Sequence, residues 1–153
     1  MNEVIKNKLY LGNLFDANNK KDIKKNKITT IICVAEGIKI NKPEVKVYSY
    51  NIQDDYNCNI SLYFDEIGEI INKEKTVLVN CIAGISRSST IVISYIMKYL
   101  NLNLRDAFLL VRSKSPLICP NKEFMKYLLE YELKIFGENS LTYDECINLF
   151  YYT

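Results

Sequence analysis

Residues 77–88, VLVNCIAGISRS, place a cysteine, a glycine and an arginine at a spacing that suits chemistry on an oxyanion. The apolar start is typical of a buried strand, Cys81 follows it, and Arg87 begins a helix after a loop of five residues. Successive N–H groups of such a loop, with the positive end of the helix, form a cradle for phosphate or another oxyanion. Gly84 allows a turn that other residues resist, and Arg87 offers a planar pair of donors to two phosphate oxygens.

The same cradle makes Cys81 a candidate nucleophile. A helix N-terminus and a nearby arginine both favour the thiolate, which is the reactive form of a cysteine side chain. Cys81 would then attack a phosphoryl group without a neighbouring base. The chain contains no histidine, which excludes Ser-His-Asp and Cys-His catalysis and histidine-bound metals. Acid–base work must therefore come from carboxylates, thiols or tyrosines.

The order of strands and helices around this motif predicts an α/β fold with a central, mostly parallel sheet flanked by helices. Strands are expected at residues 8–12, 28–34, 45–52 and 76–79, the middle two in a buried sheet, with a connecting loop at 35–44 and about six residues before the first strand. Helices are expected from an N-cap at Asp16 to Lys27, at residues 60–73 with Asn59 or Ser61 as cap, at 87–100, from Asn103 to Ser113, from Asn121 to Gly137 with Phe124, Leu128, Tyr131 and Ile135 facing inward, and at 141–151.

The composition indicates one domain: 153 residues, 48% hydrophobic and 25% charged. A net charge of +2 does not indicate nucleic-acid binding, and Lys20, Lys21, Lys24, Lys25 and Lys27 are expected on a solvated helix face. No apolar stretch reaches the length of a membrane span and no cationic leader opens the chain, so we expect a soluble intracellular protein without a membrane partner. The odd number and wide spacing of the cysteines argue against a disulfide framework or a cysteine-rich metal site, and leave Cys33, Cys58, Cys119 and Cys146 as core or surface thiols, with Cys58 a weak candidate for redox sensitivity.

VNCIAGISRSST resembles the signature of the cysteine-dependent protein phosphatases, and in particular of the small (atypical) dual-specificity phosphatases, whose usual form is VHCxAGxSRS. LYLGNLFDA resembles the opening strand and turn of that family, ITTIICVAE its second strand, IQDDYNCNISLYF its acid loop and next helix, and SPLICPNKEFMKYLLEYE its C-terminal segment. The resemblance covers about residues 7–136. It implies a three-layer protein tyrosine phosphatase-like architecture, in which residues 1–153 form a single catalytic domain and residues 137–153 are a C-terminal extension.

The resemblance also implies a role for each matching residue. Cys81 would form a phosphocysteine intermediate, Arg87 would clamp the phosphoryl group, and Ser88 would stabilise the leaving thiolate. Asp54, six residues before the expected helix, would be the general acid and then the general base, with Asp55 as the fallback. Asn121 resembles an asparagine that braces the phosphate loop, although a helix N-cap also accounts for it. The cradle would be completed by the backbone amides of Ile82, Ala83, Gly84, Ile85, Ser86 and Arg87.

Asn80 departs from the family pattern, which has histidine before the nucleophile. Asparagine can donate and accept hydrogen bonds there, but it cannot carry a positive charge. We therefore expect the Cys81 thiolate to be less strongly favoured, and hydrolysis to be slower, than in a relative with histidine.

The expected activity is hydrolysis of phosphotyrosine and of phosphoserine or phosphothreonine in proteins, with neither cofactor nor metal. One alternative is a weakened pseudophosphatase that binds phosphoproteins. Others are an RNA 5′-phosphatase or a phosphoinositide phosphatase, against which the apolar loop residues argue, and a rhodanese-like sulfurtransferase, which would not explain the spacing of Asp54. The composition, rich in Lys, Asn, Ile and Tyr, is similar to that of poxviral dual-specificity phosphatases. The expected location is the cytoplasm, or a host cytoplasm or virion if the source is viral. The oligomeric state is left open between a monomer and a homodimer.

Overall fold

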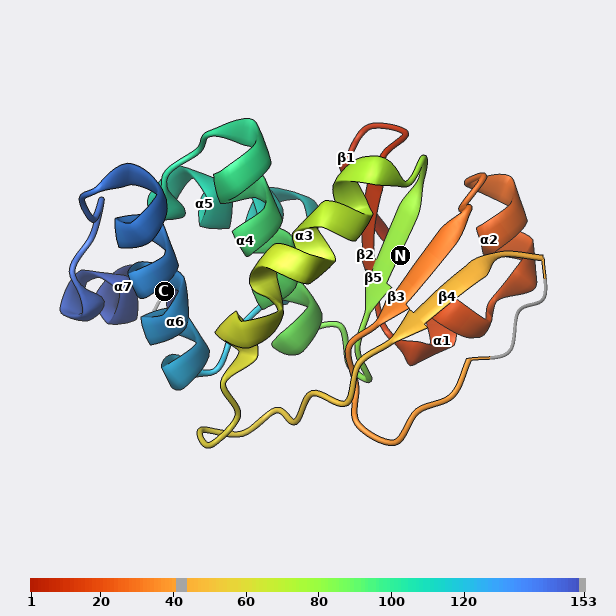
Figure 1. Cartoon of the computed structure of the whole chain (residues 1–153), viewed down its shortest axis with the longest axis horizontal. Coiled ribbons are helices and arrows are strands. Elements are labelled where there is room, and N and C mark those ends of the chain that lie inside the picture. Colours follow the sequence, from red (N-terminus) through yellow and green to blue (C-terminus); the bar gives the residue numbers. More distant parts are fainter. Residues whose placement is uncertain (41–43, 152–153) are drawn as a thin grey trace.

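A five-stranded sheet forms the centre of the computed structural model, which describes residues 1–40 and 44–151 (Figure 1). Helices α1 and α2 lie on one side of this sheet, and α3 to α7 lie on the other (Figure 1). The expected α/β architecture with flanking helices is confirmed. Across the sheet the strands follow the order β1 (Asn2–Ile5), β2 (Leu9–Gly12), β5 (Val77–Asn80), β3 (Thr30–Cys33) and β4 (Lys46–Ser49).

The four neighbouring strands β2, β5, β3 and β4 are parallel, and their register determines where the site is built. Gly12 of β2 and Cys33 of β3 both pair with Asn80, the last residue of β5. Because parallel strands end at the same edge of a sheet, these three residues surround the start of the loop that begins with Cys81. β2, β3 and β5 are buried throughout, which is why each is mainly apolar, with the polar residues Thr30 and Asn80 at strand ends.

The amino-terminal part of the chain differs from the sequence prediction. β1 was not expected, because it has only four residues, of which Asn2 and Glu3 are polar and exposed, and it adds to β2 as an antiparallel edge strand. The single helix expected from an Asp16 cap is wrong: it is two short helices, α1 (Leu14–Asn18) and α2 (Lys20–Lys25). Asn13 caps α1, and Asp16 closes the capping box from its third position. Asn19 then leaves the helical region, at φ −87° and ψ 90°, and caps α2.

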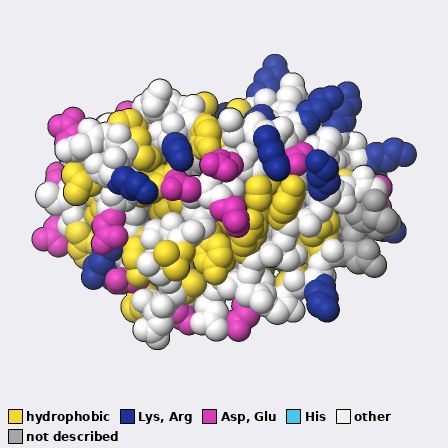
Figure 2. Space-filling view, in the orientation of Figure 1, with side chains coloured by type: hydrophobic (Ala, Val, Ile, Leu, Met, Phe, Trp, Pro, Cys, Tyr) yellow, Lys and Arg dark blue, Asp and Glu magenta, His cyan; other side chains and the backbone are white. Residues whose placement is uncertain are grey.

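The other strand and loop predictions need smaller corrections. β4 is an exposed edge strand instead of a buried one, because its outer side has no paired strand among the described residues. Residues 35–40 and 44 form neither helix nor strand, as expected for the loop at 35–44, and residues 41–43 of that prediction lie outside the described residues. All five lysines of the cluster are exposed, as expected for a solvated helix face; Figure 2 shows Lys and Arg side chains gathered over this corner of the molecule.

The helices that follow are close to prediction. Asn59 caps the 3-10 helix η1 (Ile60–Tyr63), which continues as α3 (Phe64–Lys73). The long apolar run is α4 (Arg87–Leu100), buried from Arg87 to Met97. Asn103 and Asn121 cap α5 (Leu104–Lys114) and α6 (Lys122–Phe136), and α7 (Tyr143–Phe150) ends the described fold.

Three of the four residues expected on the inner face of α6 are buried, namely Phe124, Leu128 and Tyr131, whereas Ile135 is half-buried near the end of the helix. No helix in the described ranges is both long enough and apolar enough to cross a lipid bilayer.

Candidate active site

The Cys81 sulfur lies in a polar environment although the residue is only 2% exposed. Cys81 follows directly on β5, and α4 begins six residues later at Arg87. The backbone N–H of Gly84 donates to Cys81 Sγ at 3.2 Å, and Ser88 Oγ lies 3.1 Å from the same sulfur. Ser88 is completely buried in the first turn of α4. A sulfur with two hydrogen-bond donors beside it is suited to carry negative charge.

The loop around the sulfur presents unpaired backbone donors. None of the N–H groups of residues 82, 83, 85, 86 and 87 donates to an acceptor among the residues that the structure describes. Ser86, at the N-cap of α4, makes no side-chain capping bond, so the positive end of this 14-residue helix is left open. Unpaired N–H groups beside an uncapped helix N-terminus are a binding site for a tetrahedral oxyanion.

Arg87 is held from the opposite side by the segment that leads to Asp54. Its guanidinium Nη1 donates to the carbonyl oxygen of Ile52 at 2.9 Å. The residue is 9% exposed, and its buried Nε has no hydrogen-bond partner within the described ranges. An unpaired buried guanidinium nitrogen is costly, and an anion is the partner that compensates best for it.

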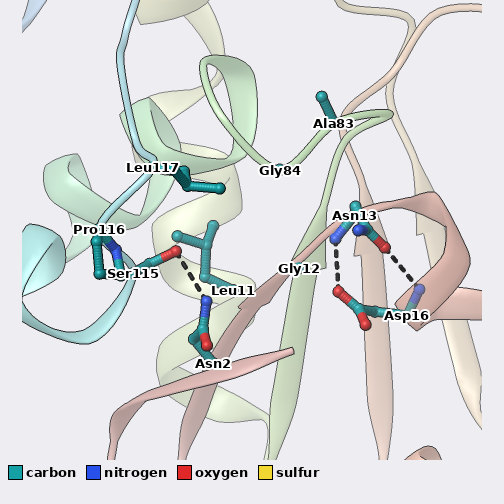
Figure 3. A pocket seen from close by; sticks show the side chains of 10 residues that line it. All are labelled: Asn2, Leu11, Gly12, Asn13, Asp16, Ala83, Gly84, Ser115, Pro116 and Leu117. Atoms are coloured by element: carbon teal, nitrogen blue, oxygen red, sulfur yellow. Dashed lines mark hydrogen bonds between the residues drawn. The ribbon is translucent and has the colours of Figure 1, made fainter.

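The turn between β2 and α1 fixes the outer side of the loop. Gly84 has a φ of +72°, and a Cβ there would lie 2.9 Å from the carbonyl oxygen of Gly12. Two residues away on each segment, the N–H of Leu14 donates to the carbonyl of Ile82 at 2.9 Å. A small cavity of about 170 Å³ lies beside the contact between Gly12 and Gly84 (Figure 3). It is lined by Asn2, Leu11, Gly12, Asn13, Asp16, Ala83, Gly84, Ser115, Pro116 and Leu117. Its lining belongs to the walls that support the loop.

Asn121 joins the phosphate loop to the acid segment. Its backbone N–H donates to Ser86 Oγ at 2.9 Å, and its Oδ1 accepts from the N–H of Phe124 at 2.9 Å as the cap of α6. Its Nδ2 donates to Asp54 Oδ1 at 3.1 Å and, at 3.4 Å, to the carbonyl of Asp55. The two roles weighed for Asn121, cap and brace, are therefore compatible.

The two candidate acids are placed differently. Asp54 is exposed, and its carboxylate faces Asn121. Asp55 is half-buried, and its Oδ1 accepts from the N–H of Asn57 at 2.9 Å, within its own turn. The carboxylate of Asp54 is thus the one connected to the phosphate loop.

Asn80 only partly behaves as expected. Its Nδ2 donates to the carbonyl of Cys81 at 3.2 Å and to Cys33 Sγ at 3.7 Å. Its buried Oδ1 has no partner in the described part of the chain, so of the two capacities of an asparagine side chain only the donor is used here. The reason is geometric, since both neighbours that Asn80 contacts act as acceptors. Burial raises the pKa of the Cys33 thiol, so that side chain remains neutral. All five cysteines are free thiols, with Cys33 and Cys146 buried, Cys58 half-buried and Cys119 exposed.

Sequence reasoning missed several contacts that complete the site. Three contacts were not anticipated: the hydrogen bond from Arg87 to the carbonyl of Ile52, the hydrogen bond from the N–H of Asn121 to the hydroxyl of Ser86, and the close approach of Gly12 to Gly84. The first two involve polar groups of residues far apart in sequence, and the sequence carries no signal for them. For the third there was a signal: a glycine at the end of a strand often marks a close backbone contact.

Comparison with known proteins places these features in a family. The family model for the dual specificity phosphatase catalytic domain matches residues 9–134. Human dual specificity protein phosphatase 18 is 33% identical over 138 residues, which cover 87% of this chain and 73% of that protein. Dual specificity protein phosphatase 1 of Arabidopsis thaliana is 37% identical over 134 residues, covering 84% of this chain and 68% of that protein.

Solved structures agree with the sequence comparison. The crystal structure of DUSP15 is similar with a TM-score of 0.81 and 31% identity, and 85% of each chain is covered. The human tyrosine phosphatase-like serine/threonine/tyrosine-interacting protein has a TM-score of 0.82 and 33% identity, with 88% of this chain and 96% of that chain covered. The chain therefore belongs to the dual specificity phosphatase family and is a protein phosphatase.

Proposed function

We propose that the chain hydrolyses phosphorylated tyrosine, serine and threonine side chains with Cys81 as the nucleophile and Asp54 as the general acid and base. The observation that carries this proposal is the sulfur of Cys81, which accepts from the Gly84 N–H at 3.2 Å beneath a loop of unpaired amides. The unpaired Nε of Arg87 supplies a further donor for the phosphoryl oxygens.

In the first step, the Cys81 thiolate attacks phosphorus, and the bond between phosphorus and the substrate oxygen breaks as the bond to sulfur forms. The loop N–H groups and Arg87 stabilise the charge on the three other oxygens, which is where catalysis of phosphoryl transfer gains most. Asp54, protonated, gives its proton to the departing oxygen. The products are the dephosphorylated side chain and a phosphocysteine.

In the second step, water attacks the phosphorus of the phosphocysteine while the Asp54 carboxylate takes a proton from that water. The bond between sulfur and phosphorus breaks, and inorganic phosphate leaves. The Ser88 hydroxyl, 3.1 Å from the sulfur, donates to the thiolate as it reappears. Asp54 therefore gives a proton in the first step and takes one in the second, and Ser88 stabilises the thiolate that the second step releases.

The rim of the site favours a protein substrate. The exposed side chains of the loop are apolar: Ile82 is 48% exposed, Ile85 is 36% exposed, and Ala83 lies between them. Apolar side chains pack against the residues that flank a phosphorylated side chain, whereas a polyphosphate or an inositol ring carrying several phosphates requires additional cations. The partner that we propose is therefore a phosphoprotein, and neither a nucleic acid nor a membrane is part of the proposal.

A second candidate function is a phosphoprotein-binding module with weak or no catalysis. It is favoured by Asn80, whose buried Oδ1 has no partner among the described residues, and by the similarity to a protein named as phosphatase-like and interacting. The presence of a nucleophile, an acid and Ser88 together favours the enzyme, because binding alone requires only the cradle.

Cys81→Ser distinguishes the two candidates. We expect hydrolysis of para-nitrophenyl phosphate to fall by at least roughly 10³-fold, because the nucleophile is part of a cooperative catalytic unit. Cys119→Ser, at an exposed thiol on the neighbouring segment, is the control and should keep full activity. Wild-type protein that binds phosphopeptides without turnover, or a Cys81→Ser variant that retains turnover, would contradict the proposed mechanism. Matched phosphotyrosine and phosphothreonine peptides then give the preference among substrates.

We further place the protein in a reducing compartment such as the cytoplasm, since Cys81 must remain a thiol to react and all five cysteines are unpaired. If the source is viral, as the similarity in composition to poxviral phosphatases indicates, the compartment would be a host cytoplasm or a virion. Both a monomer and a homodimer are compatible with the site, because its residues come from one chain.

A further inference from the structure

Helix α7 lies beyond residues 9–134, the part of the chain that the family model matches, yet it is firmly anchored. The Phe150 ring stacks on Phe108 of α5, with centroids 3.8 Å apart and planes 17° from parallel. Cys146 is completely buried, and a capping box between Thr142 and Glu145 fixes the start of the helix. Tyr151, which follows directly on α7, is therefore held in a defined position.

The Tyr151 hydroxyl reaches the segment between α5 and α6. It donates to the carbonyl oxygen of Pro120 at 2.6 Å, across 31 residues of sequence. Burial raises the pKa of this hydroxyl, so it remains a protonated donor at every pH at which the protein would work. The contact is a short hydrogen bond to a carbonyl whose residue precedes Asn121.

That carbonyl belongs to the peptide group that also contains the N–H of Asn121. The two ends of this group, the oxygen of Pro120 and the N–H of Asn121, point in opposite directions because the peptide is planar and trans. At one end the group accepts from Tyr151, and at the other it donates to Ser86 Oγ in the phosphate loop at 2.9 Å. A hydrogen bond to the carbonyl polarises the group and strengthens the bond that its N–H makes.

A parallel contact ties the same segment to the loop. The N–H of Cys119 donates to the carbonyl of Ile85 at 2.9 Å. Asn121, two residues further on, extends its Nδ2 to Asp54. The Pro120–Asn121 peptide group is therefore linked directly to Ser86 and, through the Asn121 side chain, to Asp54.

We propose that Tyr151 is a positioning residue for the phosphatase reaction, which holds the Pro120–Asn121 peptide in the orientation that joins the phosphate loop to Asp54. This inference rests on the proposed function, since it assigns the acid to Asp54. It gives the residues after 134 a part in catalysis at a distance, through one hydroxyl.

Tyr131 provides a matched control elsewhere in the fold. Its hydroxyl donates to Asp65 at 2.7 Å, and its ring packs on Phe64. Tyr131→Phe removes a similarly short hydrogen bond from a comparable aromatic residue, but one that is not linked to the loop or to Asp54. A loss of activity that comes only from lowered stability would appear in both variants.

The test compares Tyr151→Phe with Tyr131→Phe in steady-state kinetics on two substrates. Phenyl phosphate has a poor leaving group and depends on the general acid, whereas para-nitrophenyl phosphate has a good one. For Tyr151→Phe we expect kcat on phenyl phosphate to fall by about 2- to 12-fold, which corresponds to one net hydrogen bond. The loss on para-nitrophenyl phosphate should be smaller, and Tyr131→Phe should keep the wild-type kcat on both.

A double-mutant cycle with Asp54→Asn tests the route of the effect. If Tyr151 acts through Asp54, Tyr151→Phe should cause little further loss on phenyl phosphate once the acid is gone. Equal losses on both substrates, full additivity with Asp54→Asn, or a wild-type kcat for Tyr151→Phe would each overturn the inference. A Cys81→Ser protein that still turns over would instead overturn the proposed function, so the two failures are distinguishable.

Discussion

The two halves of the active site are built in different ways. Cys81, Arg87 and Ser88 are close in sequence, buried, and fixed between the end of β5 and the first turn of α4. Asp54 is exposed on a segment that forms neither helix nor strand, and it meets the rest of the site through Asn121. The proposed nucleophile is therefore positioned by local backbone structure, whereas the carboxylate of the proposed acid is held by a hydrogen bond from a residue 67 positions away in sequence.

This difference predicts how substitutions in each half of the site affect the protein. Buried residues within regular elements share the global stability of the fold, whereas exposed segments open at much lower cost. The phosphate loop should tolerate little change in shape, because several backbone contacts converge on it. In the acid half, the loss of a single hydrogen bond should be enough to change the position of Asp54.

The largest effect is expected from Asp54→Asn, which removes the acid and leaves the cradle intact. Hydrolysis of phenyl phosphate should fall by roughly 10²- to 10⁴-fold, the usual contribution of a general acid, and that of para-nitrophenyl phosphate much less. Steady-state kinetics on both substrates measure it. Asp55→Asn is the matched control, because that carboxylate accepts from Asn57 in its own turn. If Asp55→Asn caused the larger loss, the acid half would have to be reassigned.

Gly84→Ala tests the shape of the nucleophile half. Its Cβ would lie 2.9 Å from the Gly12 carbonyl at a φ of +72°, so the loop must shift. We expect the kcat/KM on para-nitrophenyl phosphate to fall roughly 10-fold or more, since small misplacements of reacting groups are costly. Gly137→Ala shares the positive φ, +76°, but has open space around it. It should lower the free energy of unfolding by about 1–2 kcal/mol in a urea titration and keep its activity. Equal activity of the two variants would show that the contact with Gly12 is unimportant.

Asn80→His addresses the charge beside the nucleophile. A histidine can carry a positive charge where the asparagine leaves its Oδ1 without a partner, so the Cys81 thiolate should be favoured. We expect labelling by iodoacetate at pH 6 to be faster and the kcat to rise by a few fold.

Asn80→Asp is the counterpart, since it has nearly the same shape and adds a negative charge. It should slow the labelling. Labelling rates that do not change in opposite directions would mean that the residue acts through packing and not through charge.

The smallest effect is expected at Asp65, on the helix that follows the acid segment. The hydrogen bond from Tyr131, followed by that from Lys98, lowers the pKa of the Asp65 carboxyl. A lowered pKa in the folded state contributes stability above the unfolded pKa of about 3.9, and that contribution is lost as the pH falls through the folded value. Asp65→Asn should therefore reduce the free energy of unfolding at pH 7 by less than about 1 kcal/mol, because the group is half exposed, and by less at about pH 3, below the unfolded pKa. Urea titrations at the two pH values check this; a constant difference would contradict it.

The prediction from sequence succeeded where chemistry and local structure coincide. The apolar run before Cys81, the glycine and the arginine specify strand, loop and helix within twelve residues, and the caps at Asn59, Asn103 and Asn121 mark helix starts through bonds to nearby N–H groups. It failed at β1 and at the expected Asp16 cap. β1 has only four residues, too few to show an alternating pattern, and Asn13 and Asp16 are both residue types that cap helices, so the sequence did not show that Asn13 is the cap and Asp16 its capping-box partner.

The sequence by itself determined the family to which the chain belongs, and it was enough to propose the nucleophile and its cradle, because these depend on residues that are adjacent along the chain. Only the tertiary structure decided which carboxylate faces the site, how Arg87 is held by the Ile52 carbonyl, and that Tyr151 touches the peptide before Asn121. Hydrogen bonds to backbone carbonyls leave no mark on residue type, since every residue has one. Their partners appear only when the chain has folded.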